Sequence, residues 1–266
     1  MKEALKYQLK ELAEYYETTD FLHGDPAQFM HRYSLPDDVE IIAFIAASLA
    51  FGERSQILRK IEDICQLMEH EPSAWIRQEK FNVSFPESDE KFYRFYSYAD
   101  MRAFFFQIKG IIDRHGSIGT FIKQRYEKGV HPLKAIIEAF ADCPSERNLI
   151  PQNTHSSCKR VNMFLRWMVR DNSAVDVGLW NWIDKKELII PADTHVIQEA
   201  LRLGIISKAG SSLSKAIEIT NALRFVWPDD PCKGDFALFG WGINHHKDVK
   251  SSQKEDIRRK IKVYLR

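Results

Sequence analysis

Two segments of this 266-residue sequence hold side chains whose types and spacing could do chemistry. In the first, Pro191 breaks the preceding structure, Asp193 follows, and an amphipathic helix begins at once and stops at Gly204. A carboxylate at the start of a helix has little freedom to move. In the second segment, 34 positions earlier, Lys159 lies on a helix with a cationic face. We therefore predict that Asp193 and Lys159 face each other across a cleft, where a carboxylate could stabilise positive charge and an amine could act as a nucleophile.

Both residues also have a simpler structural interpretation. Aspartate is a favoured N-cap residue, so the Asp193 side chain could accept a hydrogen bond from the amide of His195 or Val196. This capping role is compatible with a chemical one. Lys159 could belong to a solvated cationic helix face, which is a common feature of soluble proteins.

The helix predicted over residues 155–170 has two different faces. One arc is apolar and is expected to pack in the core: Val161, Phe164, Leu165, Met168 and Val169. The opposite arc carries Lys159, Arg166 and Arg170, with Arg160 and Trp167 beside them. These cations could hold phosphates, and Trp167 could stack on a base or pack beneath the segment that follows. The candidate nucleic-acid-binding residues are Arg160, Arg166, Arg170, Trp167 and His195.

Composition and charge indicate a folded protein with one basic half. Hydrophobic residues make up 44% and aromatic residues 12% of the chain, which excludes a disordered protein. The longest apolar run, residues 41–51, is too short to span a bilayer, and the N-terminus does not resemble a secretory signal. We therefore expect a cytoplasmic protein without a membrane partner. The net charge is +1, but residues 151–266 carry 19 Lys and Arg against 13 Asp and Glu, which permits nucleic-acid binding.

The sequence predicts no metal and no cofactor. The four cysteines are too far apart for a CxxC pair, so we expect reduced thiols instead of a zinc or iron–sulfur site. His155 and Cys158 have a spacing typical of metal ligands, as do His245 and His246 with Cys232 nearby. Two ligands without a matching second pair do not make a site.

Helical periodicity dominates the chain and predicts an all-α fold. The segment after Pro36 is apolar nearly all round up to Gly52, so that helix is expected at the centre of the protein. Residues 70–98 are irregular and rich in aromatics, which could line a groove or, as we prefer, pack on neighbouring helices. No strand alternation is persuasive. Helices are expected over residues 2–17, 36–51, 57–68, 99–114, 117–127, 131–142, 155–170, 193–203 and 213–226, from residue 236, and over the basic tail 250–266.

The segment from Pro191 to Val196, continued by Arg202-Leu203-Gly204, resembles the P-V-D-T-H-V…R-L-G signature of the helix-hairpin-helix DNA glycosylases. Residues 158–170, 235–240 and 37–52 are similar to an uncharacterised bacterial family of distant glycosylase relatives, a likeness that covers nearly the whole chain. The long separation between Lys159 and Asp193 resembles that of the archaeal 8-oxoguanine glycosylases. The chain departs from the glycosylase pattern at residues 150–159, where no glycine provides the usual phosphate-binding hairpin.

The resemblance implies a fold and an activity. The fold would have two helical subdomains flanking a cleft, one over about residues 30–190 and the other combining 1–29 with 191–266. The activity would be excision of an oxidised purine such as 8-oxoguanine from duplex DNA, with Asp193 stabilising an oxocarbenium-like state. Lys159 would attack C1′ of the sugar as a neutral amine and give the enzyme abasic-site lyase activity. Arg160 competes for the same position in the cleft, but it stays protonated and could not form a Schiff base.

Two other functions fit the same residues. One is a non-catalytic nucleic-acid-binding module on the same fold, and the other is a helical interaction protein without a nucleic-acid role. The sequence does not choose DNA over RNA, and it leaves the oligomeric state open.

Overall fold

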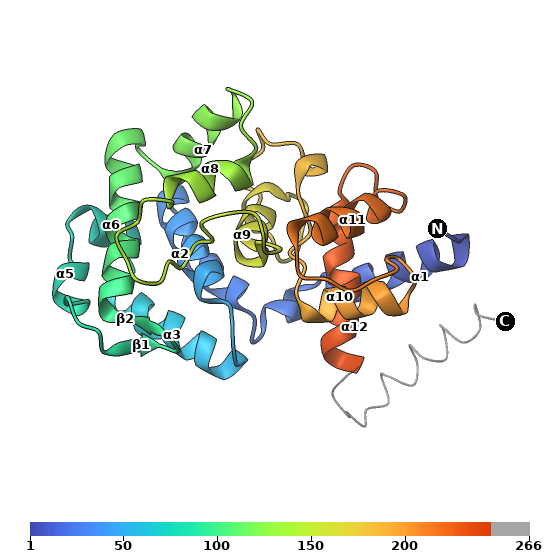
Figure 1. The fold of residues 1–266 in the computed structure, drawn as a ribbon, viewed down its shortest axis with the longest axis horizontal. Coiled ribbons are helices and arrows are strands. Elements are labelled where there is room, and N and C mark those ends of the chain that lie inside the picture. Colours follow the sequence, from blue (N-terminus) through green and yellow to red (C-terminus); the bar gives the residue numbers. More distant parts are fainter. Residues whose placement is uncertain (246–266) are drawn as a thin grey trace.

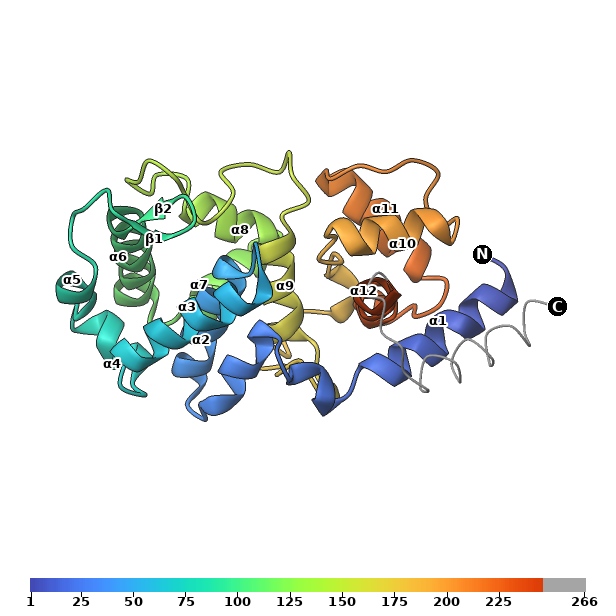
Figure 2. The same cartoon turned by 90° about the horizontal axis from the view of Figure 1, so that it is seen from below.

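The computed structural model describes residues 1–245, and these residues form a mostly helical protein (Figure 1). Helix α9 lies in the middle of the molecule in both views (Figures 1 and 2). Helices α2 to α8 lie on one side of it, and α1 with α10, α11 and α12 lies on the other. This arrangement agrees with the predicted all-α class. The division into two subdomains and the likeness to the glycosylase fold stay predictions, and the predicted helix over residues 250–266 falls outside the described residues.

The helices predicted within residues 1–245 are present, with ends that shift by a few residues, and two short helices, α4 and α5, lie in the segment 70–98 that was predicted to be irregular. Their bounds are α1 (Glu3–Tyr16), α2 (Pro36–Leu49), α3 (Arg54–Leu67), α4 (Pro72–Arg77), α5 (Phe81–Ser84), α6 (Tyr98–His115), α7 (Ile118–Tyr126), α8 (Pro132–Ala139), α9 (Lys159–Val169), α10 (Thr194–Arg202), α11 (Leu213–Leu223) and α12 (Gly234–His245). Short 3₁₀ helices connect them: η1 (Thr19–Leu22), η2 (Pro26–Arg32), η3 (Lys185–Glu187) and η4 (Pro231–Lys233).

Helix α2 is buried on all sides, as its composition predicts. Pro36 stands at its start with acidic residues in the first turn, where the helix dipole favours them. The buried Glu40 carboxylate accepts hydrogen bonds from the Gly119 amide at 2.9 Å and from the Trp180 indole nitrogen at 2.7 Å. Burial raises the pKa of Glu40, against the effect of these two donors. The Glu40 carboxylate therefore fixes both α7 and the segment before α10 to α2.

The segment before α6 contains a short hairpin that the sequence did not predict. Strands β1 (Lys91–Tyr93) and β2 (Tyr96–Ser97) pair antiparallel, and they are too short to give a clear alternation. Tyr93 and Tyr96 are buried against Phe51, with ring centroids 5.1 and 5.5 Å from it. Aromatic packing on neighbours is thus the role of these tyrosines, and Phe95 is the exposed member of the group.

The cation-bearing face of α9 is buried, so its prediction as an accessible stripe was wrong. Arg166 is 4% and Arg170 1% exposed, and Trp167 is fully buried. The apolar arc is buried as predicted. Residues 171–183 fold back over the other arc, because the amides of Val177 and Gly178 donate to the Trp167 carbonyl.

Carboxylates from distant parts of the chain neutralise the two buried guanidinium groups. Arg166 pairs with Asp176 at 3.1 Å and with Asp235 of α12. Arg170 pairs with Asp176 and with two further carboxylates, Glu17 after α1 at 2.8 Å and Asp230 before α12 at 2.9 Å. This buried arginine network joins α9 to both ends of the described chain.

None of the helices within residues 1–245 is both long enough and apolar enough to cross a membrane.

Replacing Arg170 by methionine will destabilise the protein strongly. The change removes the cation shared by Asp176, Glu17 and Asp230, of which the first two have side chains no more than 7% exposed, and breaking a buried ion pair typically costs about 3–5 kcal/mol. The matched change Lys185→Met removes an exposed ion pair with Asp171 and should cost less than about 1 kcal/mol. Urea unfolding of both variants measures the difference, and equal losses would contradict a structural role for the network.

Candidate functional site

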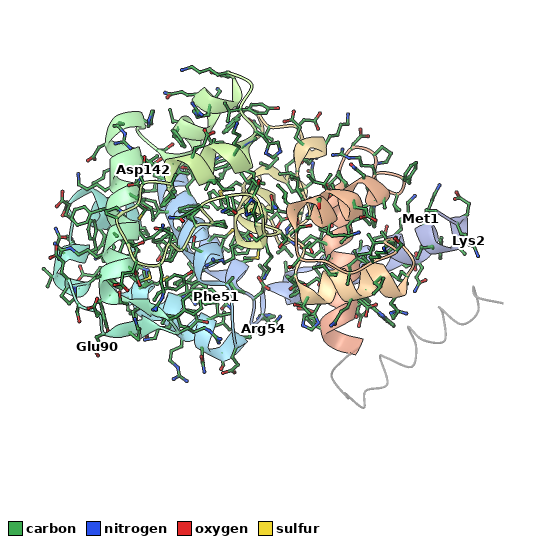
Figure 3. All side chains as sticks on the ribbon, viewed as in Figure 1. Met1, Lys2, Phe51, Arg54, Glu90 and Asp142 are labelled. Atoms are coloured by element: carbon green, nitrogen blue, oxygen red, sulfur yellow. The ribbon has the colours of Figure 1, made fainter. Side chains whose placement is uncertain are left out.

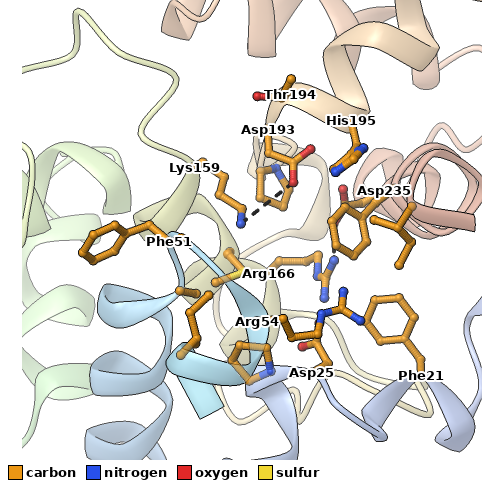
Figure 4. A pocket seen from close by; sticks show the side chains of 18 residues that line it. Phe21, Asp25, Phe51, Arg54, Lys159, Arg166, Asp193, Thr194, His195 and Asp235 are labelled. Atoms are coloured by element: carbon orange, nitrogen blue, oxygen red, sulfur yellow. Dashed lines mark hydrogen bonds and ion pairs between the residues drawn. The ribbon is translucent and has the colours of Figure 1, made fainter. Parts of the chain in front are cut away.

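A pocket of about 590 Å³ lies between the two groups of helices, where the starts of α9 and α10 meet the chain after α2 (Figure 4). Figure 3 places Phe51 and Arg54 in this central part of the molecule. The lining combines charged and aromatic side chains: Phe21, Asp25, Phe51, Arg54, Lys159, Arg166, Asp193, Thr194, His195, Asp235 and Phe239. A volume of this size is typical of a small-molecule site.

Lys159 and Asp193 both line the pocket. The Lys159 Nζ lies 4.0 Å from Asp193 Oδ2, and the side chains are 28% and 18% exposed (Figure 4). Asp193 is also the N-cap of α10, because its Oδ1 accepts a hydrogen bond from the Val196 amide at 2.9 Å. The capping prediction is therefore confirmed, and the second carboxylate oxygen remains directed at the lysine.

A short set of hydrogen bonds holds the two helix starts together. The Ser157 hydroxyl donates to the Ala192 carbonyl at 2.9 Å, and the Asn162 amide group donates to the Ser157 carbonyl at 3.0 Å. Cys158 precedes α9 with a φ of 50°, a left-handed conformation that reverses the chain just before Lys159. Helix α9 therefore begins at Lys159, four residues later than predicted, and the amine is placed at its first turn.

The floor of the pocket is a cluster of buried charged groups. Asp25 is 8% exposed, and its carboxylate caps η2 through the Ala27 amide at 3.0 Å. Asp235 is 4% exposed and pairs with Arg166. Burial raises the pKa of Asp25, and it raises the pKa of Asp235 to about 7 even though the Arg166 guanidinium opposes the shift. Asp193 and Lys159 form the rim of the pocket, and their charges also shift the pKa of Asp235. The charged groups of the floor and the rim therefore interact with each other.

Aromatic rings form part of the wall. Phe21 lies 6.1 Å from Phe239, and the His195 ring lies 6.3 Å from Phe239, measured between ring centroids. Rings of this kind offer a planar ligand a surface to stack on. His195 thus lies at the pocket, as expected of a candidate binding residue.

The structure separates the two competing cations at the start of α9. Lys159 lines the pocket, whereas Arg160 turns away from it: the Arg160 Nη1 donates to the Ser48 carbonyl at 2.7 Å, and its guanidinium lies 4.9 Å over the Phe51 ring. Arg170 and Trp167 do not line the pocket, and Arg166 contributes only to its floor. The surface for phosphates that we predicted on α9 is therefore reduced to its first turn.

Other pocket residues escaped the sequence analysis. Asp25 and Arg54 stand in segments without a distinctive pattern, and Asp235 was noticed only for its likeness to a family. Gly52 gives one signal, because a glycine directly after a buried helix marks a tight turn. Its φ is 102°, and a Cβ there would lie 2.7 Å from the Arg94 guanidinium, so Arg94 lies against the turn whose residues Gly52 and Arg54 line the pocket.

Within residues 1–245, no group of three or more His, Cys, Asp or Glu side chains is arranged to hold a metal ion. All four cysteines are free and buried. His246 lies outside the described residues.

The raised pKa of Asp235 predicts a specific dependence of stability on pH. Between about pH 4 and pH 7 the folded protein keeps a proton on Asp235 that the unfolded chain has lost. Wild type should therefore lose stability relative to Asp235→Asn as the pH rises through this range, by up to about 1.4 kcal/mol per pH unit.

Asp171→Asn is the control for this measurement. Lys185 lowers the pKa of the exposed Asp171, so its contribution to stability is already complete above its unfolded pKa and is lost only in more acidic solution. Denaturant unfolding at a series of pH values should show that the difference in stability between wild type and Asp171→Asn does not change between pH 5 and pH 7. If the difference in stability between wild type and Asp235→Asn is also independent of pH, Asp235 does not keep a proton in the folded protein.

Comparison with known proteins adds the family. No curated protein and no solved structure matches the chain. The family model described as "Protein of unknown function (DUF2400)" matches residues 25–244, a span that includes every pocket residue discussed above except Phe21. The expected membership of an uncharacterised family is thus confirmed: the chain belongs to the DUF2400 family.

Proposed function

We propose that this protein is a DNA N-glycosylase that removes an oxidised purine such as 8-oxoguanine, with abasic-site lyase activity through Lys159. The observation that carries the proposal is the Lys159 amine 4.0 Å from the Asp193 carboxylate in a pocket of about 590 Å³. An amine and a carboxylate sharing one cavity are the two groups that this chemistry needs.

The reaction would use them in sequence. The neutral Lys159 amine attacks C1′ of an extruded nucleotide and forms a C–N bond while the bond from C1′ to the base breaks. The base leaves with the bonding electrons and takes up the proton that Lys159 gave to Asp193, so that Asp193 is again a carboxylate. The Asp193 carboxylate stabilises the positive charge that develops on the sugar. The new amine then loses its proton, and the sugar ring opens to an imine as O4′ takes up a proton. Loss of a C2′ proton with departure of the 3′ phosphate completes the lyase step.

The position of Asp193 supports this role. The Val196 amide holds one carboxylate oxygen, and Pro191 and the buried Ala192 restrict the chain just before it. A charge fixed in advance stabilises a transition state better than one that must move into place. The amine is close enough to exchange a proton with the carboxylate after only a small displacement.

Phosphate contacts would come from cations other than those of the buried network. Arg54 and Arg94 are exposed beside Gly52 at the edge of the pocket, and neither forms an ion pair with an acidic residue among residues 1–245. The arginines Arg166 and Arg170 are occupied by carboxylates and cannot reach a DNA backbone. The edge after α2 therefore replaces the predicted α9 stripe as the candidate surface for the DNA backbone.

Borohydride should trap the protein covalently on duplex DNA that contains 8-oxoguanine or an abasic site. Lys159→Gln should abolish the trapped product because, among residues 1–245, no other side chain that lines the pocket is a primary amine. Asp193→Asn preserves an N-cap residue but removes the charge, and it should slow excision by about 10²–10³-fold. Gel electrophoresis of the trapped complex provides the measurement.

Lys185→Gln, on η3 and away from the pocket, is the matched lysine control and should trap like wild type. Salt-sensitive DNA binding without excision or trapping on any lesion would contradict the enzyme proposal and favour the non-catalytic binding module. Stronger binding to RNA than to DNA would indicate that the substrate is RNA.

Arg54→Ala should weaken DNA binding at low salt and reduce the slope of log affinity against log salt by about 1, since one phosphate contact is lost. Lys134→Ala is the control, because Lys134 lies on α8 and its side chain is 67% exposed. Fluorescence anisotropy at several salt concentrations gives both slopes. An unchanged slope in Arg54→Ala would remove this edge from the interface.

A further inference from the structure

Two carboxyl groups at the pocket floor have no part in the proposed chemistry at the sugar. Asp25 lies on the side of the pocket away from Asp193, on the chain between η1 and η2 (Figure 4). Asp235 lies on α12, next to the Arg166 guanidinium. Both side chains are more than nine-tenths buried and both line the pocket.

These carboxyl groups keep acceptor capacity that the described protein does not use. Asp235 Oδ1 is buried and has no hydrogen-bond partner among residues 1–245, while Oδ2 pairs with Arg166. Asp25 accepts one backbone amide through Oδ1, and within the described chain it forms no ion pair. A buried acceptor without a partner is unfavourable, so a ligand that donates to it gains affinity.

Arg166 does not offset this excess of acceptors. Its three guanidinium nitrogens all contact carboxylates: Nε and Nη2 contact Asp176, and Nη1 contacts Asp235. Of the carboxylates around it, Asp235 and Asp25 line the pocket, whereas Asp176 lies outside the lining and is shared with Arg170. The floor therefore offers carboxylate oxygens to a ligand, while each nitrogen of Arg166 is already directed at a carboxylate.

We infer that Asp25 and Asp235 form a recognition site for the N–H groups of a guanine-type base, stacked beside Phe21 and Phe239. The guanine edge carries a ring N–H next to an amino group, a pair that a carboxylate accepts together. This inference rests on the proposed function, because the base must enter the pocket from the extruded nucleotide. It assigns base selection to the floor and sugar chemistry to Lys159 and Asp193.

The test compares 8-oxoguanine with 8-oxohypoxanthine, which lacks only the 2-amino group. Equilibrium binding of duplexes carrying each base is measured above pH 7, where Asp235 is ionised, and in the Lys159→Gln background, where turnover does not interfere. We expect a preference of at least about tenfold for 8-oxoguanine, the size of one lost hydrogen bond to a charged acceptor. Asp25→Asn and Asp235→Asn should each reduce that preference to within about threefold.

Asp38→Asn is the matched control. Asp38 is a buried carboxylate that accepts the Ser73 amide at 2.8 Å, as Asp25 accepts an amide, but it does not line the pocket. It should keep the full preference. Melting temperatures identify any variant that fails to fold, and Asp25→Asn keeps the test valid if Asp235→Asn destabilises the arginine network.

The outcomes separate the two proposals. An unchanged preference in folded Asp25→Asn and Asp235→Asn overturns base recognition at the floor, as does equal binding of the two bases by the parent. Trapping of Lys159 on abasic DNA, where no base is present, tests the sugar chemistry independently. Loss of trapping with a retained base preference would therefore reject the lyase and keep the recognition site.

Discussion

The pocket depends on the burial of two arginines on one face of α9. A guanidinium group removed from water is strongly unfavourable unless carboxylates surround it, so Arg166 and Arg170 require partners that the helix itself does not supply. Those partners come from the loop after α9, from the end of α1 and from around the start of α12. The chain can satisfy the arginines only by bringing the end of α1 and the start of α12 together, and this brings α12 and the chain after α1 to the pocket.

A second, smaller constraint sets the chemistry at the rim. The hydrogen bond from Ser157 to the Ala192 carbonyl joins the residues just before α9 to those just before α10. Each helix then begins within two residues of this bond, Lys159 on one side and Asp193 on the other. Since both side chains stand at a first turn, neither can move far without breaking a cap or a turn. The backbone thus fixes the carboxylate through its cap and sets the start of the lysine side chain close enough for the amine to reach 4.0 Å from it.

The sequence predicted the rim well and the floor poorly, for physical reasons. Asp193 was predictable because an N-cap has a local signature, and the amphipathic helix behind it confirms where the cap must lie. Lys159 and Arg160 could not be ranked, since one step along a helix turns a side chain by about 100° and the helix start was uncertain by a few residues. Arg166 and Arg170 misled the analysis, because a periodic pattern separates apolar from charged faces but does not reveal carboxylates 60 residues away that bury the charge. Asp25 and Asp235 have no local signature at all, and only the folded chain places them together.

The balance of charge in the pocket connects the fold to the proposed function. Lys159, Arg54 and Arg166 face Asp25, Asp193 and Asp235, so the lining is close to neutral as a whole. It is not neutral locally: the cations at the rim suit a phosphate-bearing strand, and the carboxyl groups at the floor suit N–H donors. A site with this polarity accepts a nucleotide in one direction, base inward and backbone outward. That direction places C1′ between floor and rim, beside the Lys159 amine. The buried arginine network maintains the polarity, because it commits Arg166 to its carboxylates and leaves the acceptors of the floor in excess.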